Sequence, residues 1–186
     1  SGVFLALCLA SALIQLEDFT GTDWDIRVIH AEARNIAVNP FPAEMQNAEY
    51  YYRFPNNAAL LALFTGWYRL WLLAGGAGAD LNLAASLLAV LFLWIAQLLF
   101  YHAVRIFSGP AQGLFGAAVW VLVLPFYGYA STPYSDTMSL PFCTGMLLCL
   151  ALLRKTSQPL WAVGAGLCAG AAFQLKGTYA VLIVAV

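Results

Sequence analysis

Residues 81–104 read LNLAASLLAVLFLWIAQLLFYHAV, and this stretch decides the fold class. It contains no Asp, Glu, Lys or Arg. A helix needs about 20 predominantly apolar residues to cross the hydrocarbon of a bilayer, and inside lipid every backbone polar group must be paired within the protein. The stretch therefore predicts a membrane-spanning α-helix.

The composition of the whole chain agrees with this prediction. Of 186 residues, 62% are hydrophobic and 9% are charged, and the mean hydropathy is +0.78. A soluble globular domain carries about a quarter charged residues, so a single water-soluble fold is excluded. The net charge of -1 lacks the excess of Lys and Arg that binding to nucleic acid requires. We predict an all-α, polytopic transmembrane helical bundle whose surroundings are the lipid bilayer.

Further apolar blocks flank residues 81–104, and we predict one transmembrane module over residues 1–186. The expected segments are the end of a first transmembrane helix (1–16), an external acidic loop (17–57), a juxtamembrane helix (58–74), four transmembrane helices (81–104, 111–130, 138–153 and 159–175) and the start of the next helix (178–186). Because both terminal segments are shorter than ~20 residues, we expect a piece of a longer chain.

The acidic loop and the basic residues predict the sidedness of the chain. Seven of the nine acidic residues lie within residues 17–57, where residues 25–37 predict a short helix. If residues 58–74 do not cross, then Arg105 and the Arg154–Lys155 pair fall together on one side, opposite the acidic loop. Positive residues favour the cytoplasmic side, so this arrangement is preferred. It places the acidic loop and Lys176 on the external face.

Two groups of polar residues in the acidic loop are candidates for chemistry. Asp23 and Asp25 could accept a proton from an acceptor hydroxyl or hold a divalent cation; a solvated loop with a helix cap is the alternative. Arg53 and Tyr52 belong to the run Tyr50–Asn57, which could bind a phosphate through the Arg guanidinium. The same run could instead be an aromatic belt that anchors the chain at the membrane surface.

Two further candidates lie on the same expected face. Tyr134 and Asp136 occupy the turn 131–137 between two predicted spans, where Asp136 could serve a site or cap the following helix. Lys176 ends a predicted span before Gly177 and could bind an anionic ligand. Alternatively, its side chain extends to the lipid headgroups.

The order of these elements resembles the N-terminal module of the GT-C glycosyltransferases, in particular the branch of protein O-mannosyltransferases and lipid A aminoarabinose transferases. Those enzymes begin the first external loop with Asp-Glu, followed by an aromatic residue four positions and an Ala eight positions after the Asp. Counted from Asp25, the Ala is present as Ala33, whereas Ile26 replaces the Glu and Ile29 replaces the aromatic residue. The family's Lys-Gly-Pro motif resembles Lys176-Gly177-Thr178, and its second acidic loop resembles residues 133–136.

The resemblance implies an integral-membrane glycosyltransferase that moves a sugar from a polyprenyl-phosphate donor to an acceptor glycan, lipid or protein. Asp25, or Asp23, would be the catalytic base on the external face of what we expect to be a bacterial cell membrane. Lys176 and Arg53 would bind the donor phosphate, with Tyr52, Tyr134 and Asp136 nearby. Asp136 would orient the acceptor or a metal, and whether a divalent cation at Asp25 and Asp136 is needed stays open.

Two other classes of protein would also place polar residues between spans. A transporter or channel subunit would concentrate them at the middle of the bilayer on broken helices, whereas the spans here carry few, such as Gln97 and His102. A non-catalytic membrane assembly protein would not need an external grouping of Asp and Lys. Both remain alternatives to the glycosyltransferase.

Overall fold

The structure is a computed structural model, which describes residues 2–14, 24–39, 45, 47–75, 80–122, 126–131, 133–179 and 181. The regular elements within these ranges are all helices, which confirms the predicted all-α class. They are α1 (Gly2–Ile14), α2 (Trp24–Val38), α3 (Ala48–Arg53), α4 (Asn57–Gly75), α5 (Leu81–Ser108), α6 (Pro110–Leu122), the 3-10 helix η1 (Phe126–Ser131), α7 (Ser135–Thr156), α8 (Leu160–Leu175) and the 3-10 helix η2 (Gly177–Tyr179).

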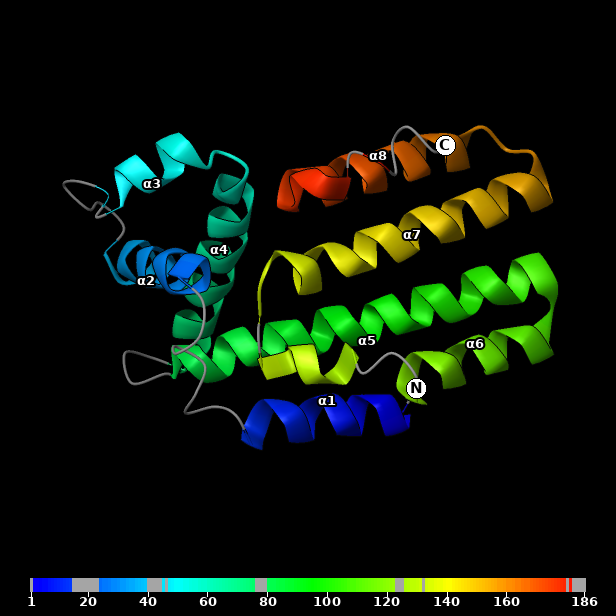
Figure 1. Ribbon diagram of the computed structural model, residues 1–186, viewed down its shortest axis with the longest axis horizontal. Helices are drawn as coiled ribbons and strands as arrows, with labels where there is room; N and C mark the ends of the chain where they lie inside the picture. Colours follow the sequence, from blue (N-terminus) through cyan, green and yellow to red (C-terminus); the bar gives the residue numbers. More distant parts are fainter. Residues whose placement is uncertain are drawn as a thin grey trace.

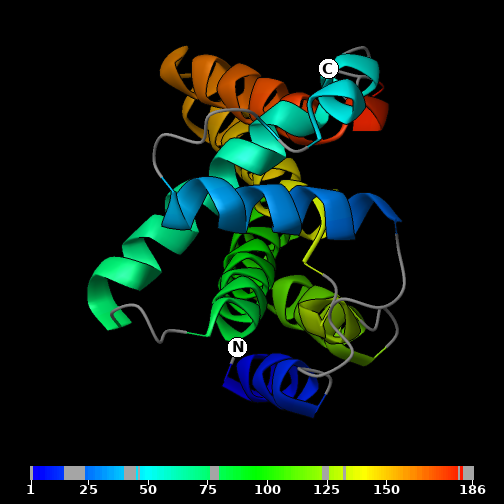
Figure 2. The same cartoon turned by 90° about the vertical axis from the view of Figure 1, so that its left-hand side faces the viewer.

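The helices form two regions, which Figure 1 shows along the length of the molecule. The bundle consists of α1, α5, α6, η1, α7 and α8, which run roughly side by side. The cap consists of α2, α3 and α4, and lies across one end of the bundle. Figure 2 looks at this end, with α2 crossing in front of bundle helices seen nearly along their axes. The chain passes back and forth, so α5 and α7 both begin at the cap and α8 returns to it.

Close packing of α7 against its neighbours holds the bundle together. α7 contacts α5 on one side and α8 on the other. A Cβ added at Gly145 of α7 would lie 3.2 Å from the Cys168 sulfur of α8, and one added at Gly164 of α8 would lie 3.1 Å from the Cys149 sulfur. Small residues allow helix backbones in membranes to approach closely. These glycines therefore set the spacing of α7 and α8.

An apolar core joins the cap to the bundle. Phe64 and Tyr68 of α4 are fully buried in it, as is Met138 of α7. The rest of the buried cluster comes from α2, α3, α4, α5 and α8: Ile29, Ala33, Tyr50, Leu60, Leu61, Ala84, Ala85, Leu88, Ala89 and Leu175. Because each fully buried apolar side chain contributes about 1.5–3 kcal/mol, this core fixes the position of the cap over the bundle.

α4 combines a spanning length with a crosswise orientation. Among the described helices, α4, α5 and α7 are long and apolar enough to cross a membrane, while α1, α6 and α8 are shorter apolar helices. Yet α4 runs across the bundle axis in Figure 1, whereas α5 and α7 run along it. The juxtamembrane assignment of residues 58–74 stays a prediction.

Within the expected helix 111–130, the structure describes α6, which ends at Leu122, and the 3-10 helix η1, which begins at Phe126. Residues 123–125 lie outside the described ranges. The expected helix 25–37 of the acidic loop closely matches α2, at Trp24–Val38.

Candidate functional site

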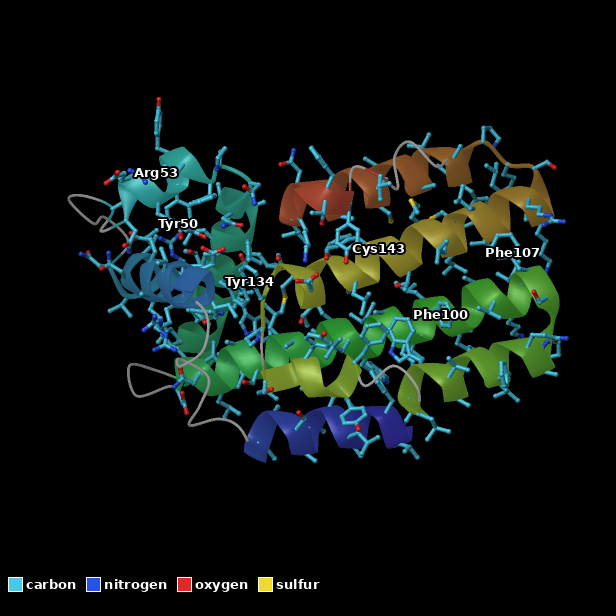
Figure 3. All side chains as sticks on the ribbon, viewed as in Figure 1. Tyr50, Arg53, Phe100, Phe107, Tyr134 and Cys143 are labelled. Atoms are coloured by element: carbon cyan, nitrogen blue, oxygen red, sulfur yellow. The ribbon has the colours of Figure 1, made fainter. Side chains whose placement is uncertain are left out.

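Asp25 and Tyr134 meet where the cap touches the bundle. Asp25 lies in the first turn of α2, and Tyr134 directly precedes α7 in an extended backbone conformation. The Tyr134 hydroxyl donates a hydrogen bond to Asp25 Oδ2 at 3.0 Å. Figure 3 labels Tyr134 at the start of α7, facing the cap. Two segments separated by more than a hundred residues therefore form one polar contact.

Tyr50 of α3 adds a second phenol to this contact. Its hydroxyl accepts a hydrogen bond from Asn57 Nδ2 at 2.5 Å and lies close enough to Asp25 to respond to its charge. Burial, together with the negative charge of Asp25, raises the pKa of both Tyr50 and Tyr134 above the usual tyrosine range. Both phenols therefore stay protonated. Tyr134 donates its proton to the Asp25 carboxylate, and Tyr50 lies on the α3 side of the same carboxylate.

A second group of hydrogen-bonded residues surrounds His30, on the same helix as Asp25. His30 of α2 is 3% exposed. Its Nδ1 lies 2.5 Å from the Tyr68 hydroxyl of α4, and its Nε2 lies 3.1 Å from the Pro133 carbonyl oxygen. Burial lowers the pKa of His30 to about 3, against the effect of the Pro133 hydrogen bond. His30 is therefore neutral and connects three parts of the chain.

Glu32 attaches α3 to α2. Its side chain is fully buried, and Glu32 Oε2 accepts hydrogen bonds from the backbone N–H and the side-chain amide of Asn47, both at 3.1 Å. Asn47 directly precedes α3. Because Tyr50 follows in the first turn of α3, the Glu32–Asn47 contact determines where the Tyr50 hydroxyl lies.

Lys176 and Asp136 form an ion pair on the other side of the α7 N-terminus. The pair joins the first turn of α7 to the end of α8. Asp136 also lines a cavity of about 250 Å³. The other described residues of its wall are Leu93, Phe126, Tyr129, Thr137, Leu140 and Tyr179. The wall of the cavity is therefore partly apolar and partly polar. Lys176 lies beside the cavity through its ion pair with Asp136.

The remaining predicted site residues lie elsewhere or outside the described ranges. Arg53 pairs with Glu49 at 2.5 Å on the exposed surface of α3, and Figure 3 labels it on that helix. Tyr52 is 89% exposed. Neither is brought to Asp25 or Lys176, so their donor roles stay predictions. Asp23 lies outside the described residues.

The two carboxylates predicted to hold a divalent cation have protein partners in the structure. In the part of the chain that it describes, no group of three or more His, Cys, Asp or Glu side chains is placed to hold a metal ion. Asp25 accepts a hydrogen bond from Tyr134, and Asp136 pairs with Lys176. A divalent cation at either carboxylate stays a prediction.

His30, Glu32, Asn47 and Tyr68 were not among the site residues predicted from the sequence. One signal for two of them was present. In the helix expected at 25–37, His30 and Glu32 alternate with residues of the apolar face, such as Ile29 and Ala33. A polar side chain that is buried beside such a face needs a hydrogen-bond partner. The identity of the partner depends on segments far away in the sequence.

Comparison with known proteins identifies the family. The model of the dolichyl-phosphate-mannose-protein mannosyltransferase family matches residues 58–186, which is more than half of the chain. The matched part contains Tyr134, Asp136 and Lys176, and begins after α2 and α3. Neither the comparison with curated proteins nor that with solved structures finds a match. The chain, with its helical membrane bundle, thus belongs to the dolichyl-phosphate-mannose-protein mannosyltransferase family of GT-C membrane glycosyltransferases.

Proposed function

We propose that this protein transfers a sugar from a polyprenyl-phosphate donor to the hydroxyl of an acceptor at the external face of the membrane. One observation carries the proposal. The N-terminus of α7 brings together a carboxylate, through Tyr134 and Asp25, and a cation, through Asp136 and Lys176. A base for the acceptor and a positive charge for the leaving phosphate are the two groups that such a transfer requires.

Asp25 is the base in this proposal. As the acceptor oxygen attacks the anomeric carbon, Asp25 takes the proton of the acceptor hydroxyl. The bond between the anomeric carbon and the phosphate oxygen breaks, and the polyprenyl phosphate leaves with the electron pair. The configuration at the anomeric carbon inverts. Tyr134 holds the carboxylate in one position through its hydrogen bond, so less reorganisation is needed during transfer.

Lys176 is the cation that stabilises the leaving phosphate. It lies beside the cavity that Asp136 lines, and this cavity has apolar wall from Leu93 and Phe126. A polyprenyl phosphate has the same two-part character, with an anionic head and a hydrocarbon chain. The ammonium would exchange Asp136 for the donor's phosphate when the donor binds, because both are anionic oxygens.

The distribution of charge along the bundle supports an external site. Arg105 lies in the last turn of α5, and Arg154 and Lys155 lie in the last turn of α7. Both helices begin at the cap, so these basic residues are at the opposite end of the bundle (Figure 1). Basic residues at the ends of spanning helices favour the cytoplasmic side, which supports an external position of the cap. The crosswise orientation of α4 agrees with a helix that lies at this surface.

Replacement of Asp25 tests the proposal. In membranes supplied with a labelled polyprenyl-phosphate sugar and an acceptor, we expect Asp25→Asn to lower the transfer rate about 10²- to 10⁴-fold, the usual contribution of a positioned base. Asp80→Asn is the matched control, because Asp80 is exposed and caps α5, and Asn caps a helix equally well. Similar small losses in both variants would exclude Asp25 as the base.

A further inference from the structure

His30 and Asp25 of the same helix hold the same short segment of the chain. His30 Nε2 contacts the Pro133 carbonyl oxygen at 3.1 Å. Asp25 accepts a hydrogen bond from the next residue, Tyr134, at 3.0 Å. α2 therefore holds this segment at two points, once by its backbone and once by a side chain.

The partners of His30 determine which of its nitrogens carries the proton. The Pro133 carbonyl can only accept, so Nε2 must be the donor. Nδ1 of the neutral ring is then an acceptor, and it takes the hydroxyl proton of Tyr68 at 2.5 Å. The ring is thus fixed in one tautomer and one orientation, and it directs a donor at Pro133.

A fixed Pro133 carbonyl limits where Tyr134 can lie. The two residues share a peptide plane, and the backbone of Tyr134 is extended, with φ -132° and ψ -175°. Pro133 is fully buried. Without the His30 bond, its carbonyl would lose a buried partner, and the segment would gain freedom to rotate. The Tyr134 hydroxyl, at the far end of a long side chain, would then no longer lie reliably at Asp25.

We propose that His30 is a positioning residue for the transfer reaction, acting through Pro133 and Tyr134 on the carboxylate of Asp25. This inference rests on the proposed role of Asp25 as the base. His30 does not touch the acceptor or the donor. Its contribution is the geometry of Tyr134, so its loss lowers the rate of the chemical step and leaves donor binding almost unchanged.

Two substitutions separate the hydrogen bonds of His30 to Pro133 and to Tyr68. Gln places an amide near the position of Nε2 and can still donate to Pro133. The shorter Asn reaches only the position of Nδ1, so His30→Asn keeps a partner for Tyr68 and loses the bond to Pro133. We expect His30→Asn to lower kcat up to about 100-fold, the cost of a misplaced catalytic group, with the KM for the donor nearly unchanged. His30→Gln should recover most of this loss.

A spectroscopic probe at Tyr134 measures the positioning without activity. With 3-fluorotyrosine incorporated at position 134 of the detergent-purified protein, the fluorine resonance reports the hydrogen bond to Asp25. We expect Asp25→Asn and His30→Asn to move this resonance and His30→Gln to leave it near its original place. An unchanged resonance in His30→Asn would overturn the proposal. If His30→Asn does not fold, a resonance in His30→Gln that moves as far as in Asp25→Asn would overturn it too.

A double variant tests whether His30 acts through Tyr134. If it does, His30→Asn combined with Tyr134→Phe should be no slower than the slower single variant, because residues that act through one another do not have additive effects. Losses that multiply, or a raised donor KM with unchanged kcat, would show an independent role. If Asp25→Asn keeps its activity while the fluorine shifts follow the expected order, the proposed function fails and the positioning of Tyr134 by His30 stands.

Discussion

The cap and the bundle differ in the contacts that stabilise each of them. In addition to its share of the apolar core, the cap uses directional polar contacts, such as Glu32 with Asn47 and the Arg69 guanidinium donating to the Ile36 carbonyl at 3.2 Å. The bundle depends on apolar side chains and on close approach at Gly145 and Gly164. Lipid provides no hydrophobic force between helices, so packing decides their association there. The comparison teaches that the polar contacts of the proposed site lie at the interface between the two regions, directly beside the buried apolar core that joins them.

The largest expected effect comes from disrupting the apolar core that joins the cap to the bundle. Phe64 of α4 is fully buried between the cap and the bundle. We expect Phe64→Ala to lower the free energy of unfolding in detergent by about 3–5 kcal/mol, the usual cost of removing a buried aromatic ring. Phe115→Ala on α6 is the control, since Phe115 is 71% exposed. Equal destabilisation by the two substitutions would show that the cap is not anchored through α4.

A smaller and more local effect is expected inside the cap. Glu32→Ala removes the acceptor of two hydrogen bonds from Asn47, and a buried group without a partner costs about 1–3 kcal/mol. Hydrogen exchange should show faster opening of α3, with little change in α7. Glu32→Gln retains an acceptor oxygen and should lie near the wild type. Uniformly faster exchange in α7 as well would mean that cap and bundle open as one unit.

Substitutions of Lys176 and of its partner Asp136 should change the affinity for polyprenyl phosphate in opposite directions. We expect Lys176→Ala to weaken binding of polyprenyl phosphate about tenfold, the effect of about 1.4 kcal/mol, and Lys176→Arg to retain part of the affinity. Asp136→Asn should bind the same lipid more tightly, because the competing anion is gone. Titration of the purified variants with polyprenyl phosphate measures both, and Lys155→Ala at the other end serves as the control. Weaker binding in Asp136→Asn would assign that carboxylate to the ligand instead.

The smallest effect is expected at the outer surface of the cap. Arg53 and Glu49 form an exposed pair on α3, and exposed pairs four residues apart on a helix contribute about 0.3–0.5 kcal/mol. Arg53→Ala should therefore change thermal unfolding and transfer only slightly. A loss of transfer close to that of Lys176→Ala would show that Arg53 binds the donor despite its distance from the ion pair.

The residues predicted from the sequence separate according to their surroundings. Asp25, Tyr134, Asp136 and Lys176 are brought to the α7 N-terminus, and they stood out because charges between long apolar blocks are costly and few. Arg53 stood out for the same reason, but its side chain faces outward. A short helix such as α3 can present either face to its neighbour. No pattern within six residues decides which one.

The amino-acid sequence by itself determined the class of the protein. Apolar blocks of spanning length require helices in lipid, and their order with a Lys-Gly near the end resembles the family that the comparison then identified. These properties are local, since each depends on residues adjacent in the chain. They needed no knowledge of which helix lies beside which.

Only the tertiary structure decided the partners of the polar groups. Tyr134 reaches Asp25 across more than a hundred residues, and His30 reaches Pro133 across a similar separation. Such contacts arise because the apolar faces of α2, α4 and α7 pack in one particular arrangement, which then brings the buried polar atoms within hydrogen-bond distance. A hydrogen bond depends on tenths of an ångström, whereas apolar burial tolerates many arrangements. The sequence therefore predicts the apolar helices, because burial tolerates many arrangements. The tertiary structure alone gives the polar partners, because hydrogen bonds are short and directional.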